Sequence, residues 1–225
     1  MILTGSEHHH LSRVVRSKIG DIVWLFDEEG ARYKSRIEEI GVDRTKLVIM
    51  EESGRTELST RIVLGQALLK AKAMDFVVQK ATELGLFALA PVIAERSIAK
   101  IDDRVEKKVE RWMEIARQAA KQSRSGLVPR ISRPEPLAAF LRDHEAPQKI
   151  FLCEKGGRLL RDLVQKGEPP PEVVALIGPE GGWTDVEEKT IAACGYEAVS
   201  LGKAILRAET AALCALFLLS HFWNW

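Results

Sequence analysis

The sequence predicts an α/β protein in which a mostly parallel sheet, covered by helices on both faces, follows a small all-β domain. Residues 1–62 alternate polar and apolar positions in short runs, as half-buried strands do. Residues 63–225 instead alternate helical patterns with short, nearly continuous apolar runs, the pattern of a buried parallel sheet. The change near residue 62 predicts the boundary between two domains.

Short strands account for the first domain. Turn-rich pieces, among them residues 27–30 and 41–43, separate these strands. The period-two runs lie at residues 21–26, 32–37 and 46–50. This region therefore predicts a small antiparallel barrel or sandwich.

Strands and helices alternate in the second domain. Strands are expected at residues 61–68, 88–94, 149–153, 173–177 and 198–201. Helices are expected at residues 74–84, 104–123, 184–194, and from 209 to the C-terminus. The last helix carries no charge from Thr210 to Leu219, so it should be buried in a core or against another subunit. We expect a homodimer, because C-terminal helices often lie at a surface.

The composition limits the classes of protein to which this chain can belong. With 225 residues and 46% hydrophobic residues, the chain can form one large core or two smaller ones. It has neither an apolar stretch of the roughly 20 residues that a membrane span needs nor the layout of a secretion signal, so we expect a cytoplasmic protein. Cys153, Cys194 and Cys214 form no C-x-x-C pair and predict buried, reduced thiols. A net charge of +1 means that nucleic-acid binding would need a local basic patch.

A glycine-rich turn, GPEGG at residues 178–182, follows a predicted strand and precedes a predicted helix. Thr184 and Glu187 form a capping-box pattern at the start of that helix. Such a turn exposes backbone amides and can bind anions. The spacing, however, matches neither G-x-G-x-x-G nor a Walker motif, and Glu180, Asp185 and nearby acids disfavour a polyphosphate. The turn predicts either a site for a neutral or cationic ligand or a connection that binds nothing, and a nucleotide-phosphate enzyme is the less favoured alternative.

Two other predicted strands end in segments that suggest a binding site. One segment is FLCE at residues 151–154, and the other is LGKAILR at residues 201–207. In open α/β sheets, ligands bind outside the carboxyl ends of the strands. Together with GPEGG, these segments predict one apolar slot with backbone polar groups.

Five sequence blocks in order resemble a known family. IGPEGGWTDVEE and VSLGKAILRAETAAL closely resemble the SPOUT class of S-adenosyl-L-methionine-dependent RNA methyltransferases, and within it the bacterial 16S ribosomal RNA uridine-N3 methyltransferases. HHLSRVVRSKIGD, KATELGLFALAPVIAERS and AAKQSRSGLVPRI add to the resemblance. It implies a PUA-like β-barrel, a SPOUT domain with a C-terminal trefoil knot, and a homodimer formed through the knotted domain and the last helix. A non-catalytic ribosome assembly factor with the same fold is the alternative.

The resemblance also implies which residues contact the cofactor, S-adenosylmethionine. The implied contacts come from the three segments above and the start of the last helix: Leu152, Glu154, Ile177, Gly178, Gly181, Gly182, Leu201, Ile205, Leu206, Arg207, Thr210 and Ala211. The third segment has Lys203 and Ala204 where the family usually has Pro-Arg. The family also commonly has an arginine-bearing strand ahead of the residues that match Leu3.

The implied substrate is a uridine of 16S rRNA in the small ribosomal subunit, methylated at N3. The enzyme must align the activated methyl group with an unstacked base, and loss of the N3 proton leaves negative charge on that base. Arg207 is the candidate that stabilises this charge. Glu154 and Glu180 are further catalytic candidates, which would orient the base or accept its proton.

Local basic patches predict where RNA binds. Arg117, Lys121 and Arg124 are spaced to share one helix face, and residues 115–134 contain no acid, so phosphate contacts are predicted. The resemblance adds Arg13 and Arg16 to the predicted RNA contacts. The cations at positions 32, 34 and 36 are diluted by acids and count for less.

Three consecutive histidines, His8, His9 and His10, do not predict a metal site. In an extended strand only His8 and His10 would face the same way, and no other ligand cluster is evident. We expect a structural role instead, with one histidine packing where the two domains meet.

Overall fold

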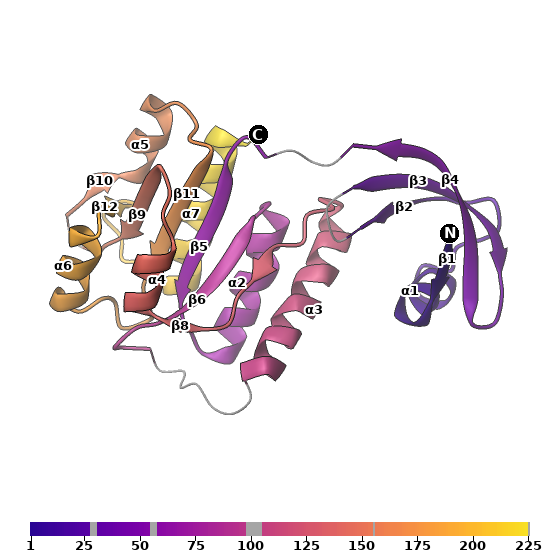
Figure 1. The fold of residues 1–225 in the computed structure, drawn as a ribbon, viewed down its shortest axis with the longest axis horizontal. Coiled ribbons are helices and arrows are strands. Elements are labelled where there is room, and N and C mark those ends of the chain that lie inside the picture. The colour runs from indigo at the N-terminus through magenta and orange to yellow at the C-terminus, as the bar shows by residue number, and fades with distance from the viewer. Residues whose placement is uncertain (28–30, 55–57, 98–104, 155, 225) are drawn as a thin grey trace. The chain divides into compact units, whose positions relative to one another are not determined.

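The computed structural model describes residues 1–27, 31–54, 58–97, 105–154 and 156–224. They form two compact units, Met1–Glu57 and Leu58–Trp225. Figure 1 shows the elements of both units. The turn at residues 28–30 and Arg104, the predicted first residue of the long helix, lie outside the described residues.

The first unit is a four-stranded antiparallel sheet in the order β1-β4-β3-β2. Its strands are β1 (Ile2–Thr4), β2 (Ile22–Phe26), β3 (Arg32–Ile40) and β4 (Arg44–Ser53). The pairing of β3 with β4 shifts register at Lys34/Ser35 and at Ile37/Glu39. Such bulges bend and twist a sheet. The three predicted strands are confirmed, and the predicted barrel is a curled half-barrel, because β1 and β2 do not pair with each other in the described chain.

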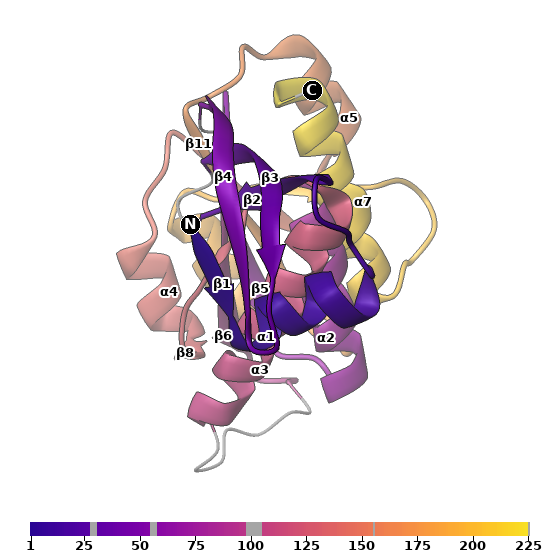
Figure 2. The ribbon, with the colours of Figure 1, turned by 90° about the vertical axis from the view of Figure 1, so that its right-hand side faces the viewer.

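A short helical segment covers the inner face of this half-barrel. It consists of α1 (Gly5–His9) and the π-helix η1 (His10–Val14), and Figure 2 shows it beside β1 and β4. The expectation that the histidines lie in a strand was wrong, because β1 ends at Thr4 and the helix begins at Gly5, whose φ of 57° suits glycine. His8 is buried within the first unit, where Nδ1 lies 2.8 Å from Thr45 Oγ1 and Nε2 lies 3.1 Å from the Val42 carbonyl oxygen. These contacts give His8 a structural role inside the first unit.

The second unit contains an eight-stranded sheet with the path β10-β12-β9-β11-β5-β6-β7, and β8 pairs with β6. Every pairing in this sheet is parallel. The strands are β5 (Arg61–Ala67), β6 (Ala88–Ile93), β7 (Arg130–Ile131), β8 (Glu135–Pro136), β9 (Gln148–Leu152), β10 (Arg158–Leu159), β11 (Glu172–Ile177) and β12 (Glu197–Ser200). The five longer strands confirm the predictions, whereas β7, β8 and β10 have two residues each and are too short to show a periodic pattern.

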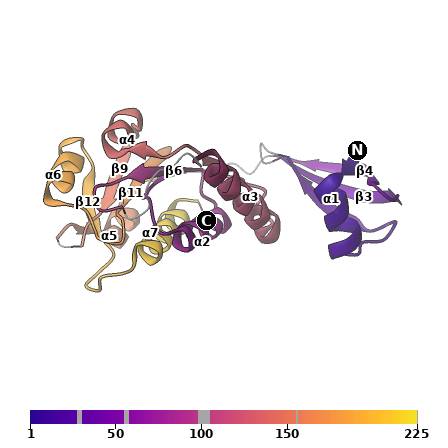
Figure 3. The same ribbon diagram turned by 90° about the horizontal axis from the view of Figure 1, so that it is seen from below.

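Helices cover both faces of this sheet, as Figure 3 shows. One face packs against α2 (Ala71–Glu83), α3 (Val105–Ser123), α5 (Leu160–Lys166) and α7 (Ala208–Trp223). The other face packs against α4 (Leu137–Asp143) and α6 (Asp185–Ala193). Four of these helices confirm the predictions, and the two that were missed, α4 and α5, have only seven residues each.

Helix α7, which carries no charge from Thr210 to Leu219, contributes to the core of its own unit. Ala212, Ala215, Leu216 and Leu219 are almost completely buried, and α7 packs against α2 and α5. Phe217, however, is 45% exposed. Burial in the core therefore explains one side of this apolar helix and leaves another side exposed.

The sheet order brings the three predicted binding segments together. β9 lies between β12 and β11, and all three strands run in the same direction. Their carboxyl ends therefore meet at one edge of the sheet, where the segments after them form three neighbouring loops. The knot implied by the family resemblance stays a prediction. In the described part of the chain, no helix combines the length and the apolar character that crossing a membrane requires.

Candidate functional site

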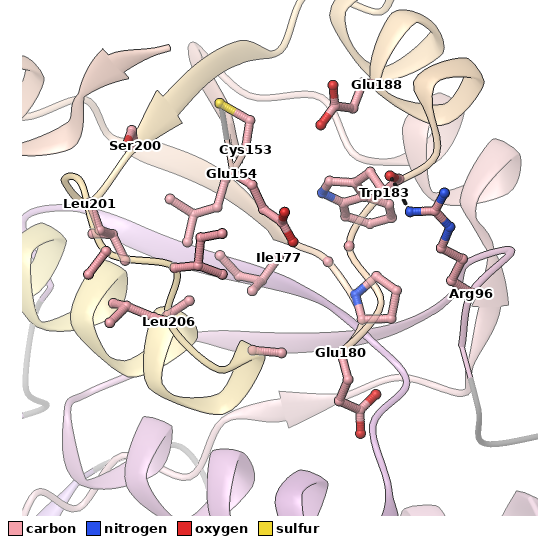
Figure 4. Close-up of a pocket in the computed structure, with 18 of the residues that line it drawn as sticks. Arg96, Cys153, Glu154, Ile177, Glu180, Trp183, Glu188, Ser200, Leu201 and Leu206 are labelled. Carbon is pink, nitrogen blue, oxygen red and sulfur yellow. Dashed lines mark hydrogen bonds between the residues drawn. The ribbon is translucent and has the colours of Figure 1, made fainter. Parts of the chain in front are cut away.

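A cavity of about 300 Å³ lies at the carboxyl ends of β9, β11 and β12. Its walls come from three loops: the first at residues 152–154, the second at residues 178–184 and the third at residues 201–207. The start of α7 and Arg96, which follows β6, complete the lining. Figure 4 shows Leu201 and Leu206 on one side of the cavity, Trp183 on the other, and Glu154 between them. The slot predicted from three strand ends is thus present as one cavity.

Most residues predicted to contact the cofactor line this cavity. Those that line it are Leu152, Glu154, Ile177, Gly178, Gly182, Leu201, Ile205, Leu206 and Ala211. Gly181, Arg207 and Thr210 are not among its lining residues. Arg207 is exposed at the N-cap position of α7, directly between two lining residues, Leu206 and Ala208. Its guanidinium has no hydrogen bond or ion pair with the described residues, so it can meet a substrate beside the cavity.

The second loop is held by hydrogen bonds from three other segments. Arg96 Nη1 donates to the carbonyl oxygens of Gly181 at 2.9 Å and Trp183 at 3.2 Å. The backbone N–H of Lys70, at the start of α2, donates to Glu180 Oε1 at 3.0 Å. The fully buried Gln66 side chain donates to the Gly178 carbonyl oxygen at 3.4 Å. These contacts fix the loop against β5, α2 and the segment after β6.

The capping box at the end of the second loop is confirmed. Glu187 N–H donates to Thr184 Oγ1 at 3.2 Å, and Thr184 N–H donates to Glu187 Oε2 at 2.9 Å. The other Glu187 oxygen, Oε1, accepts from the Glu95 backbone N–H at 2.8 Å. The buried Glu187 carboxylate therefore occupies the anion-binding end of α6, which leaves little for a phosphate to bind.

Close packing explains the glycines of the second loop. A Cβ on Gly182 would lie 2.8 Å from Glu154 Oε1, and Gly182 has a φ of 68°. A Cβ on Gly178 would lie 3.2 Å from two atoms of the Trp183 indole, and one on Gly181 would lie 3.2 Å from Arg96 Cβ. Side chains at these positions would push the loop away from its neighbours.

The third loop has much weaker restraints. Its local side-chain hydrogen bonds among the described residues join Ser200 Oγ to the backbone of Gly202, at 3.1 and 3.2 Å. Ile205 is 72% exposed and Leu206 is 37% exposed, although both line the cavity. Apolar side chains left open to solvent beside a cavity favour an apolar part of a ligand as their partner.

The charges around the cavity favour a cationic ligand. Among the described residues, four carboxylates line it, those of Glu154, Glu180, Asp185 and Glu188. The same part of the chain supplies a single arginine to the lining, Arg96, whose Nη1 already binds two carbonyl oxygens. Figure 4 shows the Glu180 carboxylate pointing away from Glu154, and Glu180 Oε1 accepts from the backbone N–H of Lys70, just before α2. A sulfonium ion or an ammonium group would be attracted here, and a polyphosphate would be repelled.

Cys153 also lines the cavity, and its thiol is neutral near pH 7. Burial, followed by the negative charge of Glu188, raises the pKa of this thiol above its ordinary value. Its Sγ lies 3.4 Å from the Gly156 carbonyl oxygen. Because the thiolate and not the thiol is nucleophilic, Cys153 serves to line the cavity and does not act as a nucleophile.

Sequence reasoning missed Arg96, Gln66 and Trp183 as parts of the site. Arg96 and Gln66 lie on other strands or loops, and no sequence spacing connects them with residues 178–184. Arg96 does lie within one of the family blocks, APVIAERS, which was the only signal that could have pointed to it. Trp183 is inside the second loop, but its burial at 7% exposure becomes evident only in the fold.

The predicted RNA contacts lie outside this cavity. Arg13 and Arg16 are exposed in and just after η1. On α3, Arg117 pairs with Glu114 at 3.6 Å, an acid just before the acid-free stretch. The expectation that Arg124 shares the face of α3 was wrong, because α3 ends at Ser123 and Arg124 has a φ of 56°. Within the described ranges, no group of three or more metal-ligating side chains gathers into a candidate metal site.

Comparison with known proteins identifies both units. Residues 56–220 match the family model of the RNA methyltransferase domain, and residues 3–50 match that of the RNA methyltransferase PUA domain. Ribosomal RNA small subunit methyltransferase E of Bacillus subtilis is 30% identical, and the match covers 97% of this chain and 89% of that protein.

Two solved structures are similar over nearly the whole chain. Ribosomal RNA small subunit methyltransferase E of Neisseria gonorrhoeae, bound to S-adenosylmethionine, is 32% identical with a TM-score of 0.90, over 100% of this chain and 92% of that chain. A methyltransferase described as putative from Legionella pneumophila, also bound to S-adenosylmethionine, is 31% identical with a TM-score of 0.88. The match covers 98% of this chain and 91% of that chain. The chain therefore belongs to the RNA methyltransferase family that joins a PUA domain to a SPOUT-type methyltransferase domain, as ribosomal RNA small subunit methyltransferase E does.

Proposed function

We propose that this protein methylates N3 of a uridine in 16S rRNA of the small ribosomal subunit, using S-adenosylmethionine, in the cytoplasm. The observation that carries the proposal is the single cavity that three loops form at the carboxyl ends of adjacent parallel strands. Similar structures bind S-adenosylmethionine, and the named relatives are rRNA methyltransferases. These relatives favour an enzyme over a non-catalytic assembly factor.

The lining of the cavity fits this cofactor. The apolar side chains of Leu201, Ile205 and Leu206 suit a purine ring, and the carboxylates opposite them suit the positive charges of the sulfonium and amino groups. The cofactor supplies a methyl group that is already activated for transfer. The chain must therefore bind it, exclude water and place the base.

Arg207 is the residue that we assign to the base. It lies at the edge of the cavity, is exposed, and its guanidinium has no partner among the described residues. As the N3 proton leaves, negative charge spreads over the ring, and a guanidinium there stabilises it. Stabilisation of charge that develops in the transition state usually contributes a large part of an enzyme's rate enhancement.

Glu154 is a better proton acceptor than Glu180. Both were candidates, but Glu180 Oε1 already accepts a hydrogen bond from the first residue before α2. Glu154 lines the cavity and points from the first loop toward the second, as Figure 4 shows. It can therefore orient the base or accept its proton without giving up a bond that holds the loop.

A homodimer formed through α7 belongs to the same proposal. Phe217 is 45% exposed and Phe222 is 37% exposed on this helix, whose other side packs into the core. Large aromatic side chains left exposed on a helix are typical of a subunit interface. Light scattering at several concentrations measures the mass of the particle, and a monomer at all of them would contradict this part.

Two measurements test the proposed function. Calorimetry should detect binding of S-adenosylmethionine and S-adenosylhomocysteine to the folded protein. Small subunits from a strain without the gene should gain one methylated uridine, seen by mass spectrometry of the rRNA, when incubated with the protein and the cofactor. A folded protein that binds neither compound would contradict the proposal. If every methylated uridine persists in the deletion strain, the catalytic role is also wrong.

A further inference from the structure

The outer face of the first-unit sheet carries a surface that the cofactor cavity does not use. Strand pairing places Trp24 opposite Lys34, and Ile22 and Val48 on either side of Arg36. Side chains alternate along a strand, and Ser35, which lies between Lys34 and Arg36, is buried on the inner face. We call the opposite face the outer sheet face, and its members include Ile22, Trp24, Phe26, Arg32, Lys34, Arg36, Glu38, Lys46, Val48 and Glu51.

A large aromatic side chain lies exposed on this face. Trp24 is 46% exposed and Ile22 is 53% exposed, although tryptophan usually buries most of its surface. Next to them, the Arg32 guanidinium lies 5.7 Å from the centre of the Phe26 ring. Aromatic rings set among cations form the surface on which proteins stack the bases of single-stranded nucleic acids.

The charges of the outer sheet face favour an anionic partner. The acids near it are Glu38, which pairs with Lys46 at 3.1 Å, Glu39, which lies across from Lys46, and Glu51, which lies across from Lys34. Arg36 is exposed, and its guanidinium has no hydrogen bond or ion pair with the described residues. The strand register thus gathers cations that appear diluted by acids along the sequence.

We propose that the outer sheet face binds a single-stranded segment of RNA. Trp24 stacks on an unpaired base, and Arg36 and Lys34 contact the phosphates next to it. A duplex keeps its bases stacked inside and would leave Trp24 without a partner. This inference rests on the proposed function, which makes RNA the substrate, and it adds a binding surface separate from Arg13, Arg16 and the α3 cations.

Fluorescence anisotropy with the full-length protein and a labelled oligouridylate tests the proposal. Trp24→Ala should weaken binding about tenfold, and Trp24→Phe should lose less because it keeps an aromatic face. The slope of log affinity against log salt concentration should become about one unit less steep in Arg36→Ala, because one phosphate contact is lost. Trp24→Ala should leave this slope unchanged. Phe76→Ala and Arg161→Ala are matched controls at exposed positions on the second unit and should bind as the wild type does.

The outcomes separate this inference from the proposed function. Trp24→Ala protein that binds the oligouridylate as tightly as the wild type would overturn the inference. An RNA duplex that competes as well as the single strand would also overturn it, as would a change in particle mass on Trp24→Ala, which would make the face a contact between copies. Binding of S-adenosylhomocysteine should be equal in all these variants. Its absence from the wild type would overturn the proposed function, whatever the RNA result.

Discussion

The second and third loops form opposite walls of one cavity, but they are held very differently. The second loop is tied to Arg96, Lys70 and Gln66 and ends in a buried capping box. The third loop, with Ile205 and Leu206 exposed, has little beyond its contacts with Ser200. One wall is thus formed before any ligand arrives, and the other needs a ligand to cover its apolar side chains. Binding of the cofactor should therefore order the third loop and change the second loop little.

Substitution of Gly182 should have the largest effect, because it breaks the preformed wall. Gly182→Val places a side chain against Glu154 at a backbone conformation that only glycine adopts easily. We expect affinity for S-adenosylhomocysteine to fall more than tenfold in calorimetry, with a loss of stability of about 1–3 kcal/mol. Gly85→Ala is the matched control: its φ is 79° with nothing within 4 Å of the added Cβ, so it should lose stability but keep cofactor affinity. Equal affinities for both variants would contradict a rigid second loop.

Removal of the Arg96 side chain should have the next largest effect. Arg96→Ala frees the carbonyl oxygens of Gly181 and Trp183, and we expect a loss of affinity for S-adenosylhomocysteine of roughly tenfold. Arg96→Lys should recover part of it. Arg111→Ala, which breaks an exposed pair with Asp75, should leave the affinity unchanged. If Arg96→Ala binds as the wild type does, the loop is held by its other contacts alone.

Substitution in the third loop should separate affinity from stability. Ile205→Ser removes an exposed apolar side chain, so the free energy of unfolding should change by less than about 0.5 kcal/mol. Affinity for S-adenosylhomocysteine should fall several-fold, because the bound ligand covers this side chain. Urea unfolding and calorimetry on the same preparation measure both quantities. A large loss of stability would show that the third loop is packed in the free protein.

Loss of the capping box should have the smallest effect on binding. Thr184→Ala removes the hydrogen bond that Thr184 Oγ1 accepts from Glu187 N–H, and we expect a loss of stability of about 1 kcal/mol by urea unfolding. Thr190→Ala, in the same helix, removes an exposed hydroxyl that donates to the Val186 carbonyl oxygen and should change stability little. Thr184→Ala should lower the affinity for S-adenosylhomocysteine less than Arg96→Ala does. A larger loss than that of Arg96→Ala would show that the capping box, rather than Arg96, mainly holds the second loop.

The long elements and the binding segments could be predicted from the sequence, because their signals are local. The apolar run before Gly178 and the Thr184–Glu187 pair lie within a few residues of each other, and both predictions are confirmed. The short strands and helices could not be predicted, since two to seven residues carry too little periodicity. The helical placement of the histidines was also missed, because the burial of His8 depends on its contact with Thr45 on β4, far along the chain.

The site itself was predicted only in part. The family resemblance implied most of the lining, but the bonds of Arg96 to the second loop join residues 85 positions apart. Such contacts arise only when parallel strands bring their ends together. The strand register also decides where charges gather, as Arg36 and Lys34 show, because every second residue faces the same way.

Amide hydrogen exchange with and without S-adenosylhomocysteine tests the central claim most directly. The claim is that the cofactor binds between a preformed second loop and a third loop that it orders. Peptides covering residues 201–207 should gain strong protection when the ligand binds, whereas peptides covering residues 178–184 should already exchange slowly and change little. Saturating ligand that leaves the exchange of residues 201–207 unchanged would contradict the claim.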